Sequence, residues 1–407
     1  MTAAASQASA ALDFDPFGAA FRSDPESWYP KLLAASPGFI EMEKIPSAFV
    51  AQHAHVTAVM RDFKRFSSVK PMGLPGMERV DFFNGQPVMN YSDPPDHQRL
   101  RRVVNSCFSP KRVARIADGA ARILDELLDS VEAGQTVEVV GRIAKPLSTR
   151  LLLGEFLDVA EADHHIFLDY LRSIPLLDAV RPGGQKPKAF LDAWQAGVSY
   201  CRGVIAHARQ SRSDDLIGLI AAAHDDGGTM SDDEMMAMMV VLFSGGISTV
   251  GAAITAALLH MAQHPDIAGR VRADSALAGN VLEESIRLAS PVALVMRFAV
   301  EDVEIGGGLI RRGMPVYTMI AAASRDPAAF PEPQRFDIDR PNLKDHVAFG
   351  HGIHTCIGNT ITRATVPMVV ETVVRRYPAL RPADSGDGPI WETTPRSRHI
   401  GSLPLSF

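Results

Sequence analysis

Apolar residues recur at steps of three and four along most of the chain from about residue 97 to 290, for example in ARILDELLDSVEAG and VGRIAKPLSTRLLLGEFL. This spacing predicts amphipathic helices, because it places the apolar side chains on one face of each helix. Alternation of apolar and polar residues, with turn glycines, occurs instead near 38–52 and 297–320, where it predicts small β-hairpins. The pattern therefore predicts a protein that is mainly α with minor β.

The longest predicted helix begins at Ser231, where Glu234 follows three residues later and completes a capping box. It ends near His264, because a proline follows that residue. Its middle contains the segment SGGISTV at 244–250, in which each glycine costs roughly 1 kcal/mol relative to alanine in a helix. Two adjacent glycines indicate that function requires an opening in this helix.

Turn-forming residues predict three irregular loops, at 67–95, 179–190 and 324–346. No repeat or change of composition marks a domain boundary, so we expect residues 25–407 to form a single domain. Residues 1–24 are predicted to be a loose tail. This tail has no basic start, and two aspartates interrupt its small residues, so it does not resemble a signal peptide.

The composition favours a small-molecule partner over a nucleic acid, because the formal net charge is -6 and phosphate binding needs a basic field. Hydrophobic residues make up 46% of the chain, which is enough for a deep buried pocket. No window reaches about 18 consecutive apolar residues, so neither a membrane anchor nor a spanning helix is expected. The three cysteines are widely spaced and imply no disulfide framework, which fits a reducing, cytoplasmic compartment.

One cysteine stands in the segment FGHGIHTCIG, at 349–358, and several kinds of chemistry compete to explain it. A zinc site built on His351, His354 and Cys356 lacks the fourth ligand that a structural site needs. A cysteine nucleophile would need an orienting group and an oxyanion site, which no motif in the chain supplies. A buried cysteine packed as a small hydrophobe is the usual fate of a free thiol, but it does not explain the glycines around this one.

A thiolate that binds haem iron explains the whole segment. Such a sulfur stays deprotonated by accepting backbone N–H hydrogen bonds, so the chain has to curl tightly beneath the flat ring. Gly350 and Gly352 permit that turn, because glycine adopts positive φ without strain. Gly358 would let the following helix approach the ring closely, and Phe349 would shield the sulfur of Cys356 from water.

The pattern F-G-x-G-x-H-x-C-x-G resembles the haem-binding signature of the cytochrome P450 family, and the match is complete. The resemblance implies the family's fold, a helix-rich prism with small β-sheets in which haem b is buried between a long distal helix and the cysteine loop. It implies that Cys356 is the proximal iron ligand and that His354 donates to a haem propionate. Glu284 and Arg287 of EESIR resemble the family's E-x-x-R pair, and Arg340 of FDIDRP stands where the family has the third member of this structural network.

Further segments agree with the resemblance. His97 and Arg101 in DPPDHQRLRRVVNSCFSP, and Arg297 in MRFAVEDVEIGG, occupy positions whose side chains bind the haem propionates in the family. Two buried carboxylates need such cations, although a solvated basic helix face would otherwise explain the first segment equally well. Pro367 departs from the family pattern, because it falls in the predicted proximal helix, where it is expected to remove a hydrogen bond and kink the chain.

The family's distal helix carries a small residue, a glycine, any residue, an acid and a threonine; this chain reads Gly245, Gly246, Ile247, Ser248 and Thr249. The resemblance implies a catalytic hydrogen bond from Thr249, although a threonine hydroxyl also often bonds the carbonyl group one turn back. Ser248 replaces the acid. Its hydroxyl would pass a proton through water, but it cannot act as an ionised base at neutral pH.

The implied function is a monooxygenase that inserts one oxygen atom of O₂ into a small to medium hydrophobic substrate, by hydroxylation or O-demethylation. We expect a monomer that takes electrons from an external ferredoxin and its reductase. A basic patch would steer an acidic carrier, with solvated charge as the alternative for each member: Arg99, Arg102, Lys111, Arg112 and Arg115. The candidate substrate-pocket residues are apolar: Ile247, Val292, Leu294, Val295, Met72, Phe82, Phe83 and Met89.

Two rival haem functions make different predictions. A peroxide-driven enzyme would carry an arginine-proline pair in the distal helix, and the sequence has none there. A gas sensor or electron carrier would offer a second axial ligand or a closed distal pocket, whereas SGGISTV indicates an open one.

Overall fold

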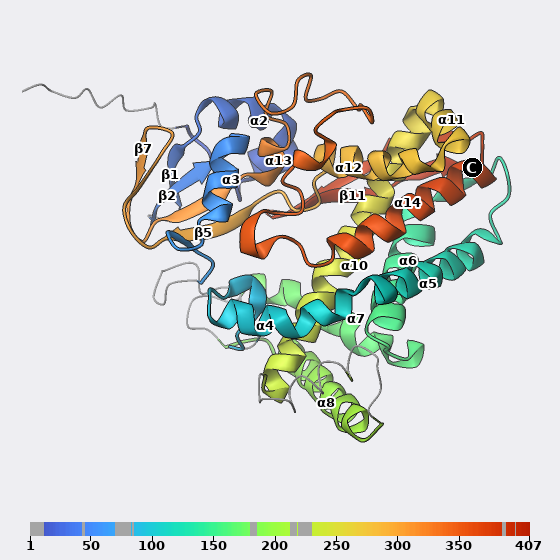
Figure 1. The fold of residues 1–407 in the computed structure, drawn as a ribbon, viewed down its shortest axis with the longest axis horizontal. Helices are drawn as coiled ribbons and strands as arrows, with labels where there is room; N and C mark the ends of the chain where they lie inside the picture. Colours follow the sequence, from blue (N-terminus) through green and yellow to red (C-terminus); the bar gives the residue numbers. More distant parts are fainter. Residues whose placement is uncertain are drawn as a thin grey trace, which may run out of the picture. The chain divides into compact units, whose positions relative to one another are not determined.

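The computed structural model describes residues 12–42, 45–69, 83, 85–179, 185–211, 218, 230–384, 388–394 and 396–407 (Figure 1). The chain divides into two compact units. The first unit consists of Met1–Pro71, Glu283–Cys356 and Trp391–His399, and the second of Met72–Leu282, Ile357–Ile390 and Ile400–Phe407. Each unit therefore joins segments that are far apart in the sequence, and the single domain expected over 25–407 stays a prediction.

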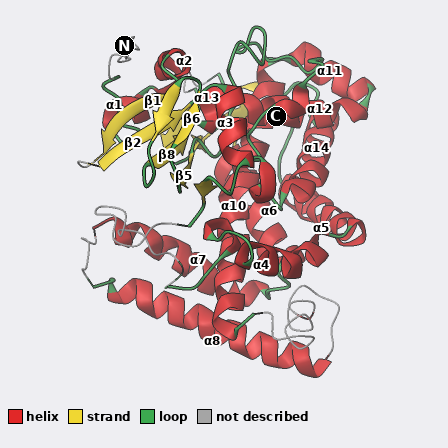
Figure 2. Ribbon diagram, turned by 60° about the vertical axis from the view of Figure 1, so that its left-hand side comes forward, coloured by secondary structure: helices red, strands yellow, loops and turns green. Residues whose placement is uncertain are grey.

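The first unit is built on a five-stranded sheet in the order β1-β2-β8-β5-β3, whose main strands are yellow in Figure 2. The strands are β1 (Gly38–Met42), β2 (Ile45–Val50), β3 (Phe66–Ser67), β5 (Val295–Ala299) and β8 (Pro315–Thr318). β1 and β2 form an antiparallel hairpin, whereas β2 and β8, which come from distant segments, run parallel. β6 (Val303–Ile305) and β7 (Gly308–Ile310) form a second hairpin in this unit.

Short helices and an aromatic core accompany this sheet: α1 (Ala19–Ser23), α2 (Pro25–Ala34), α3 (His53–Arg61) and α13 (Ile320–Ala323). Phe14 and Phe21 are buried in the core, where their ring centroids lie 5.2 Å apart and Phe14 also contacts Phe49. The loose tail predicted over 1–24 is therefore wrong for residues 12–24, because their aromatic side chains are packed against the sheet. Residues 1–11 lie outside the described part of the chain.

The second unit is mainly helical. Its helices are α4 (Asp96–Asn105), α5 (Pro110–Leu128), α6 (Lys145–Thr149), α7 (His164–Ser173), α8 (Lys188–Ser211), α10 (Asp232–Gln263), α11 (Pro265–Ala273) and α14 (Asn359–Arg376). Wide helical turns over Val140–Ala144 and Arg150–Phe156 flank α6. A three-stranded sheet joins β4 (Thr136–Glu138), β12 (Pro404–Ser406) and β9 (Arg381–Pro382). Helix α12 (Ala278–Leu288) and the hairpin of β10 (Ile390–Thr393) and β11 (Arg398–Ser402) contribute residues to both units.

Helix α10 is the longest described helix, and its ends match the prediction. Ser231 is the N-cap and forms a capping box with Glu234, and His264 is the C-cap. The helix is apolar on all sides because it packs against α6, α8 and α14. By length and composition, Asp233–Gln263 could cross a membrane, but 67% of its most apolar window is buried inside the protein, as in the core helix of a globular protein.

Helix α14 passes through Pro367 without ending. Pro367 lies on the half-exposed side of the helix, whereas Val366 and Val370 are buried. Water can therefore solvate the carbonyl group of Arg363, which an N–H at position 367 would otherwise have bonded. This position explains why the helix tolerates the proline.

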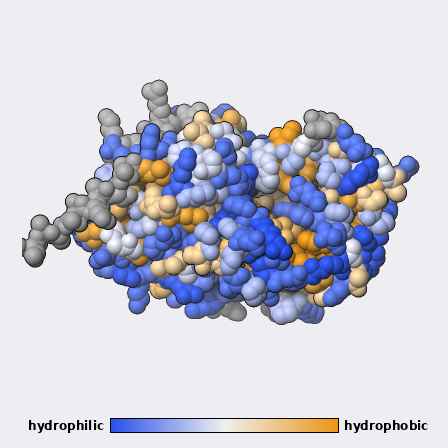
Figure 3. All heavy atoms as spheres, turned by 90° about the horizontal axis from the view of Figure 1, so that it is seen from above, coloured by the Kyte–Doolittle hydropathy of each residue, from blue (hydrophilic) through white to orange (hydrophobic). Residues whose placement is uncertain are grey.

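The structure confirms the predicted class, mainly α with minor β, and both predicted hairpin regions. It also contains strands that the pattern did not predict, including β4 inside the region expected to be helical. These strands are two to five residues long, too short for alternation to stand out. Hydrophilic residues (blue) cover much of the face seen in Figure 3, and apolar residues (orange) lie among them in several groups.

Candidate active site

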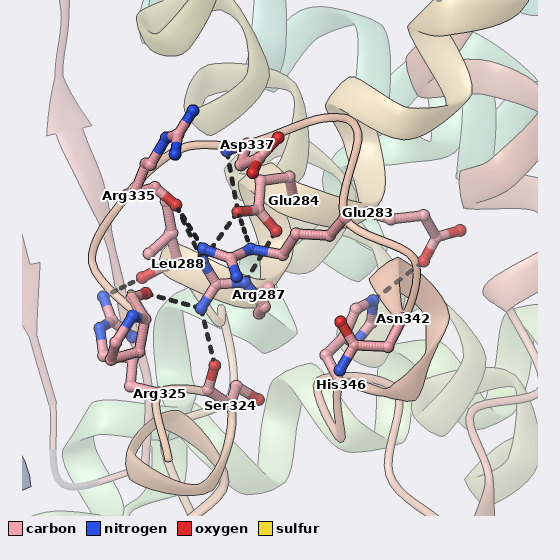
Figure 4. Close-up of polar contacts among 12 residues, drawn as sticks. Glu283, Glu284, Arg287, Leu288, Ser324, Arg325, Arg335, Asp337, Asn342 and His346 are labelled. Carbon is pink, nitrogen blue, oxygen red and sulfur yellow. Dashed lines mark hydrogen bonds and ion pairs between the residues drawn. The ribbon is translucent and has the colours of Figure 1, made fainter. Parts of the chain in front are cut away.

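A buried network in the first unit is centred on the carboxylate of Glu284, which lies on α12 (Figure 4). Arg287 donates to it from Nε at 2.7 Å and from Nη2 at 2.8 Å, and Arg340 donates from Nε at 2.9 Å. The backbone N–H of Asp337 adds a fourth hydrogen bond at 3.0 Å. The structure thus brings together the three side chains that the sequence singled out as a structural network.

The two arginines of this network also hold the irregular segment before the cysteine. Arg287 donates to the carbonyl oxygens of Ser324 and Pro333, and Arg340 to those of Glu332 and Arg335. The Glu284 and Arg287 side chains are fully buried, so the charges are paired away from water. Removing one partner of such a buried pair is costly, about 3–5 kcal/mol.

The cysteine loop follows this segment and is curled by two glycines. Gly350 has φ +70° and Gly352 has φ +73°, both in the left-handed region. A Cβ atom at Gly352 would lie 2.5 Å from the carbonyl oxygen of Met60, so only glycine fits there. The N–H of Cys356 donates to the carbonyl oxygen of Phe349 at 2.8 Å, which closes the loop.

The three cysteines lie in different environments. Cys107 and Cys201 are buried, whereas Cys356 is exposed. Burial raises the pKa of the Cys201 thiol to about 12, so this sulfur stays protonated. Cys356 is therefore the cysteine whose sulfur is available to a ligand, as the loop motif predicts.

The two histidines of the loop contact different residues in the first unit. The His354 Nε2 atom lies 2.9 Å from the hydroxyl oxygen of Ser68, a contact that the sequence analysis did not anticipate. Arg61 donates from Nε to the His351 Nε2 atom at 2.5 Å. Burial, together with the charge of Arg61, lowers the pKa of His351. His351 thus serves as a neutral acceptor for Arg61.

Strand β5 and the residues before it carry further predicted site residues. Arg297 is buried and donates from Nη1 to the carbonyl oxygen of Met296 at 2.9 Å. Leu294 is buried in the aromatic core of the first unit, and its place in a substrate pocket stays a prediction. Val292 and Val295 are half-buried and keep some exposed surface.

In the second unit, helix α10 is continuous through its glycine pair, so the predicted opening is wrong. A Cβ atom at Gly246 would lie 2.5 Å from the Cδ1 atom of Leu152, so the Leu152 side chain packs closely against this glycine. Thr249 donates its hydroxyl proton to the carbonyl oxygen of Gly245 at 2.6 Å, the alternative that the sequence left open. Ser248 is exposed.

Helix α4 places His97 and Arg101 one turn apart, with His97 buried and Arg101 half-buried. Their neighbour Arg99 donates to Glu234 at 2.7 Å, and Arg115 pairs with Asp158 at 3.2 Å. The predicted basic patch is therefore partly neutralised. Arg102 and Lys111 are exposed, and Arg112 is half-buried.

The remaining pocket candidates lie in the second unit or outside the described residues. Ile247 and Met89 are buried, and the Phe83 ring lies 6.1 Å from that of Tyr91. Met72 and Phe82 fall in the part of the chain that is not described. Of the loop at 67–95 that is expected to line the pocket, the structure therefore describes residues 67–69, 83 and 85–95.

The family model for "Cytochrome P450" matches residues 39–397. The chain belongs to the cytochrome P450 family. It is 33% identical over 353 residues to 6-deoxyerythronolide B hydroxylase of Saccharopolyspora erythraea, a match that covers 84% of this chain and 85% of that protein. It is 28% identical over 393 residues to the biotin biosynthesis cytochrome P450 of Bacillus subtilis, covering 95% and 97% of the two chains.

Solved structures of the family share the fold of this cytochrome P450. The crystal structure of P450BioI in complex with an acyl carrier protein ligated to hexadec-9Z-enoic acid has a TM-score of 0.82 at 26% identity and covers 95% of this chain and 99% of that one. The epothilone D-bound structure of cytochrome P450epoK has a TM-score of 0.84 at 25% identity, covering 97% and 99%. The protein is therefore a cytochrome P450 monooxygenase, an oxidoreductase with a haem-thiolate cofactor.

The donor set of this cytochrome P450 fits haem-thiolate ligation. The exposed thiol of Cys356, on a tightly curled loop, is the kind of sulfur donor that such a haem needs. Within the described ranges, no group of three or more histidine, cysteine, aspartate or glutamate side chains could hold a metal ion by itself. The zinc interpretation of His351, His354 and Cys356 therefore receives no support.

Proposed function

We propose that this cytochrome P450 uses haem b to insert one oxygen atom of O₂ into a small to medium hydrophobic organic substrate, by hydroxylation or O-demethylation. It would act in the cytoplasm as a monomer, with electrons supplied by an external ferredoxin and its reductase. The observation that carries the proposal is the exposed thiol of Cys356 on a loop that two left-handed glycines curl. The similarity to a hydroxylase supports oxygen insertion as the reaction.

Residues of both motif regions would hold the haem. The sulfur of Cys356 would bind the haem iron, and Phe349 and Gly358 would border it, as the family motif implies. His97, Arg101, Arg297 and His354 would neutralise the two propionates, whose burial requires positive charge or hydrogen-bond donors. When bound, the haem-thiolate supplies the activation of dioxygen and the transfer of an oxygen atom.

The hydroxyl groups of Thr249 and Ser248 on α10 would donate and transfer protons during the reaction. Thr249 holds its proton toward the carbonyl oxygen of Gly245, and a rotation about its side-chain bond would turn the donor toward the substrate side. Ser248 is exposed and would exchange protons with water, but as a hydroxyl it supplies no ionised base. We therefore expect that Ser248→Asp would raise the amount of product formed per reductant consumed.

The apolar substrate would contact side chains that keep exposed surface. Val292 and Val295 meet this condition in the first unit, and Phe83 lies at the end of the segment before α4. Lengthening or shortening one of these side chains should change which substrate is preferred, because each methylene in an apolar pocket contributes roughly 1–3 kcal/mol to discrimination. A screen of hydrophobic compounds by their effect on the haem spectrum would identify the class.

The deciding experiment is the absorption spectrum of the reduced protein with carbon monoxide. A thiolate ligand shifts the main haem band strongly to longer wavelength, and Cys356→Ser should abolish this shift. Cys107→Ser is the matched control, because Cys107 is buried and should leave the shift intact. An unshifted band in the unsubstituted protein, or an unchanged shifted band in Cys356→Ser, would refute the proposed ligand.

A further inference from the structure

Two adjacent glutamates in the middle of α12 hold two different parts of the chain before Cys356. Glu284 accepts hydrogen bonds from Arg287 and Arg340, whereas Glu283 contacts His346, as Figure 4 shows. The Glu283 Oε2 and His346 Nε2 atoms are 2.9 Å apart. Both residues are buried, with 4% and 5% of their surfaces exposed, so this contact is made away from water. Neither residue belongs to the motifs that the sequence indicates.

The hydrogen bonds of His346 determine where its proton lies. The backbone N–H of Ala348 donates to Nδ1 at 3.2 Å, so Nδ1 must carry a lone pair. The ring is then neutral, with its proton on Nε2, where it is donated to Glu283. A carboxylate that fixes the tautomer and the orientation of a histidine is a common device for positioning groups around a metal site.

The histidine is linked to the cysteine loop through Phe349. The His346 and Phe349 ring centroids are 5.9 Å apart, and the N–H of Gly350 donates to the carbonyl oxygen of Val347 at 2.8 Å. The carbonyl oxygen of Phe349 in turn accepts the N–H of Cys356 at 2.8 Å. A continuous set of hydrogen bonds and ring contacts thus runs from α12 to the backbone of Cys356.

We propose that Glu283 and His346 are positioning residues that hold the backbone around Cys356 and so set how strongly its sulfur donates to the iron. The inference rests on the proposed function, in which Cys356 ligates the haem iron. Backbone N–H groups aimed at an axial sulfur tune the reduction potential of the bound iron. Releasing His346 would free Ala348 and Phe349 to move, and the backbone N–H of Cys356, which the carbonyl oxygen of Phe349 accepts, would move with them.

The test compares His346→Phe with Glu283→Gln in the haem-loaded protein. The phenylalanine keeps the ring that packs near Phe349 but removes both hydrogen bonds, whereas the glutamine keeps an oxygen that accepts from Nε2. We expect His346→Phe to change the reduction potential, to lower the fraction of the carbon monoxide complex with the shifted band, and to transfer haem to an apoprotein acceptor roughly 10-fold faster. Glu283→Gln should stay close to the unsubstituted protein.

Two controls separate positioning from general destabilisation. Leu32→Ala removes a fully buried side chain of α2, so it should lower thermal stability without changing the potential or the band. If His346→Phe does not fold, His346→Leu, which also removes both hydrogen bonds, takes its place and must show the same three changes. The inference is overturned if the folded variant matches the unsubstituted protein in potential, band and haem transfer. Failure of the proposed function would appear earlier, as an unshifted band in the unsubstituted protein.

Discussion

Replacing Arg340 by leucine tests whether the buried network around Glu284 stabilises the segment before the cysteine. Arg340 donates from Nε to Glu284 at 2.9 Å and from Nη2 to the carbonyl oxygens of Glu332 and Arg335 at 2.8 and 3.0 Å. Its side chain is 5% exposed, so water screens these interactions little. Leucine would supply none of the hydrogen bonds and none of the charge.

The magnitude follows from what the substitution leaves behind. Removing one partner of a buried ion pair costs about 3–5 kcal/mol, because the remaining carboxylate stays buried with less compensation. Arg287 still pairs with Glu284, so we expect a loss near the lower end of that range. Against a total stability of roughly 5–15 kcal/mol, such a loss is large.

The assay is urea unfolding of the haem-loaded protein, followed by circular dichroism. Arg335→Leu is the matched control, because its guanidinium pairs with Glu332 at the surface, with side chains 62% and 73% exposed. That pair should contribute less than about 1 kcal/mol. If Arg340→Leu lowered stability by no more than Arg335→Leu, the network would not stabilise this segment and the reasoning would be refuted.

Two further predictions concern the cysteine loop and the start of α10. Gly352→Ala should disrupt the loop, because a φ of +73° strains any residue with a Cβ and that Cβ atom would collide with the backbone of α3. We expect a lower thermal midpoint of unfolding and a smaller fraction of the carbon monoxide complex with the shifted band. Unchanged values of both would contradict this. Burial alone would raise the pKa of Glu234, but hydrogen bonds from Arg99 and the Ser231 backbone outweigh burial and lower the pKa. The Arg99–Glu234 pair therefore stabilises the protein at pH values above the ordinary pKa of glutamate. This stabilisation is lost as the pH falls through the lowered pKa. Arg99→Met should therefore flatten the loss of stability on acidification; an identical pH profile would argue against the pair.

The elements that the sequence predicted well depend on neighbours along the chain. The ends of α10 are an example, because the capping box joins Ser231 to a glutamate three residues away. The cysteine loop is another, because its two left-handed glycines and its cysteine lie within one short segment. Even so, only the structure shows that Leu152 packs closely against Gly246 and that Thr249 bonds back to Gly245.

The sequence by itself determined the helical class, the long central helix, the cysteine loop and the family, because each depends on spacing within a short stretch of chain. Tertiary structure alone decided which distant side chains meet, such as Arg340 with Glu284 and His346 with Glu283. It also decided that the aromatic residues near the start of the chain are packed, and that Leu294 is a core residue. The physical reason is that burial and buried hydrogen bonds join residues whose separation along the chain carries no signal, so only the folded backbone specifies these partners.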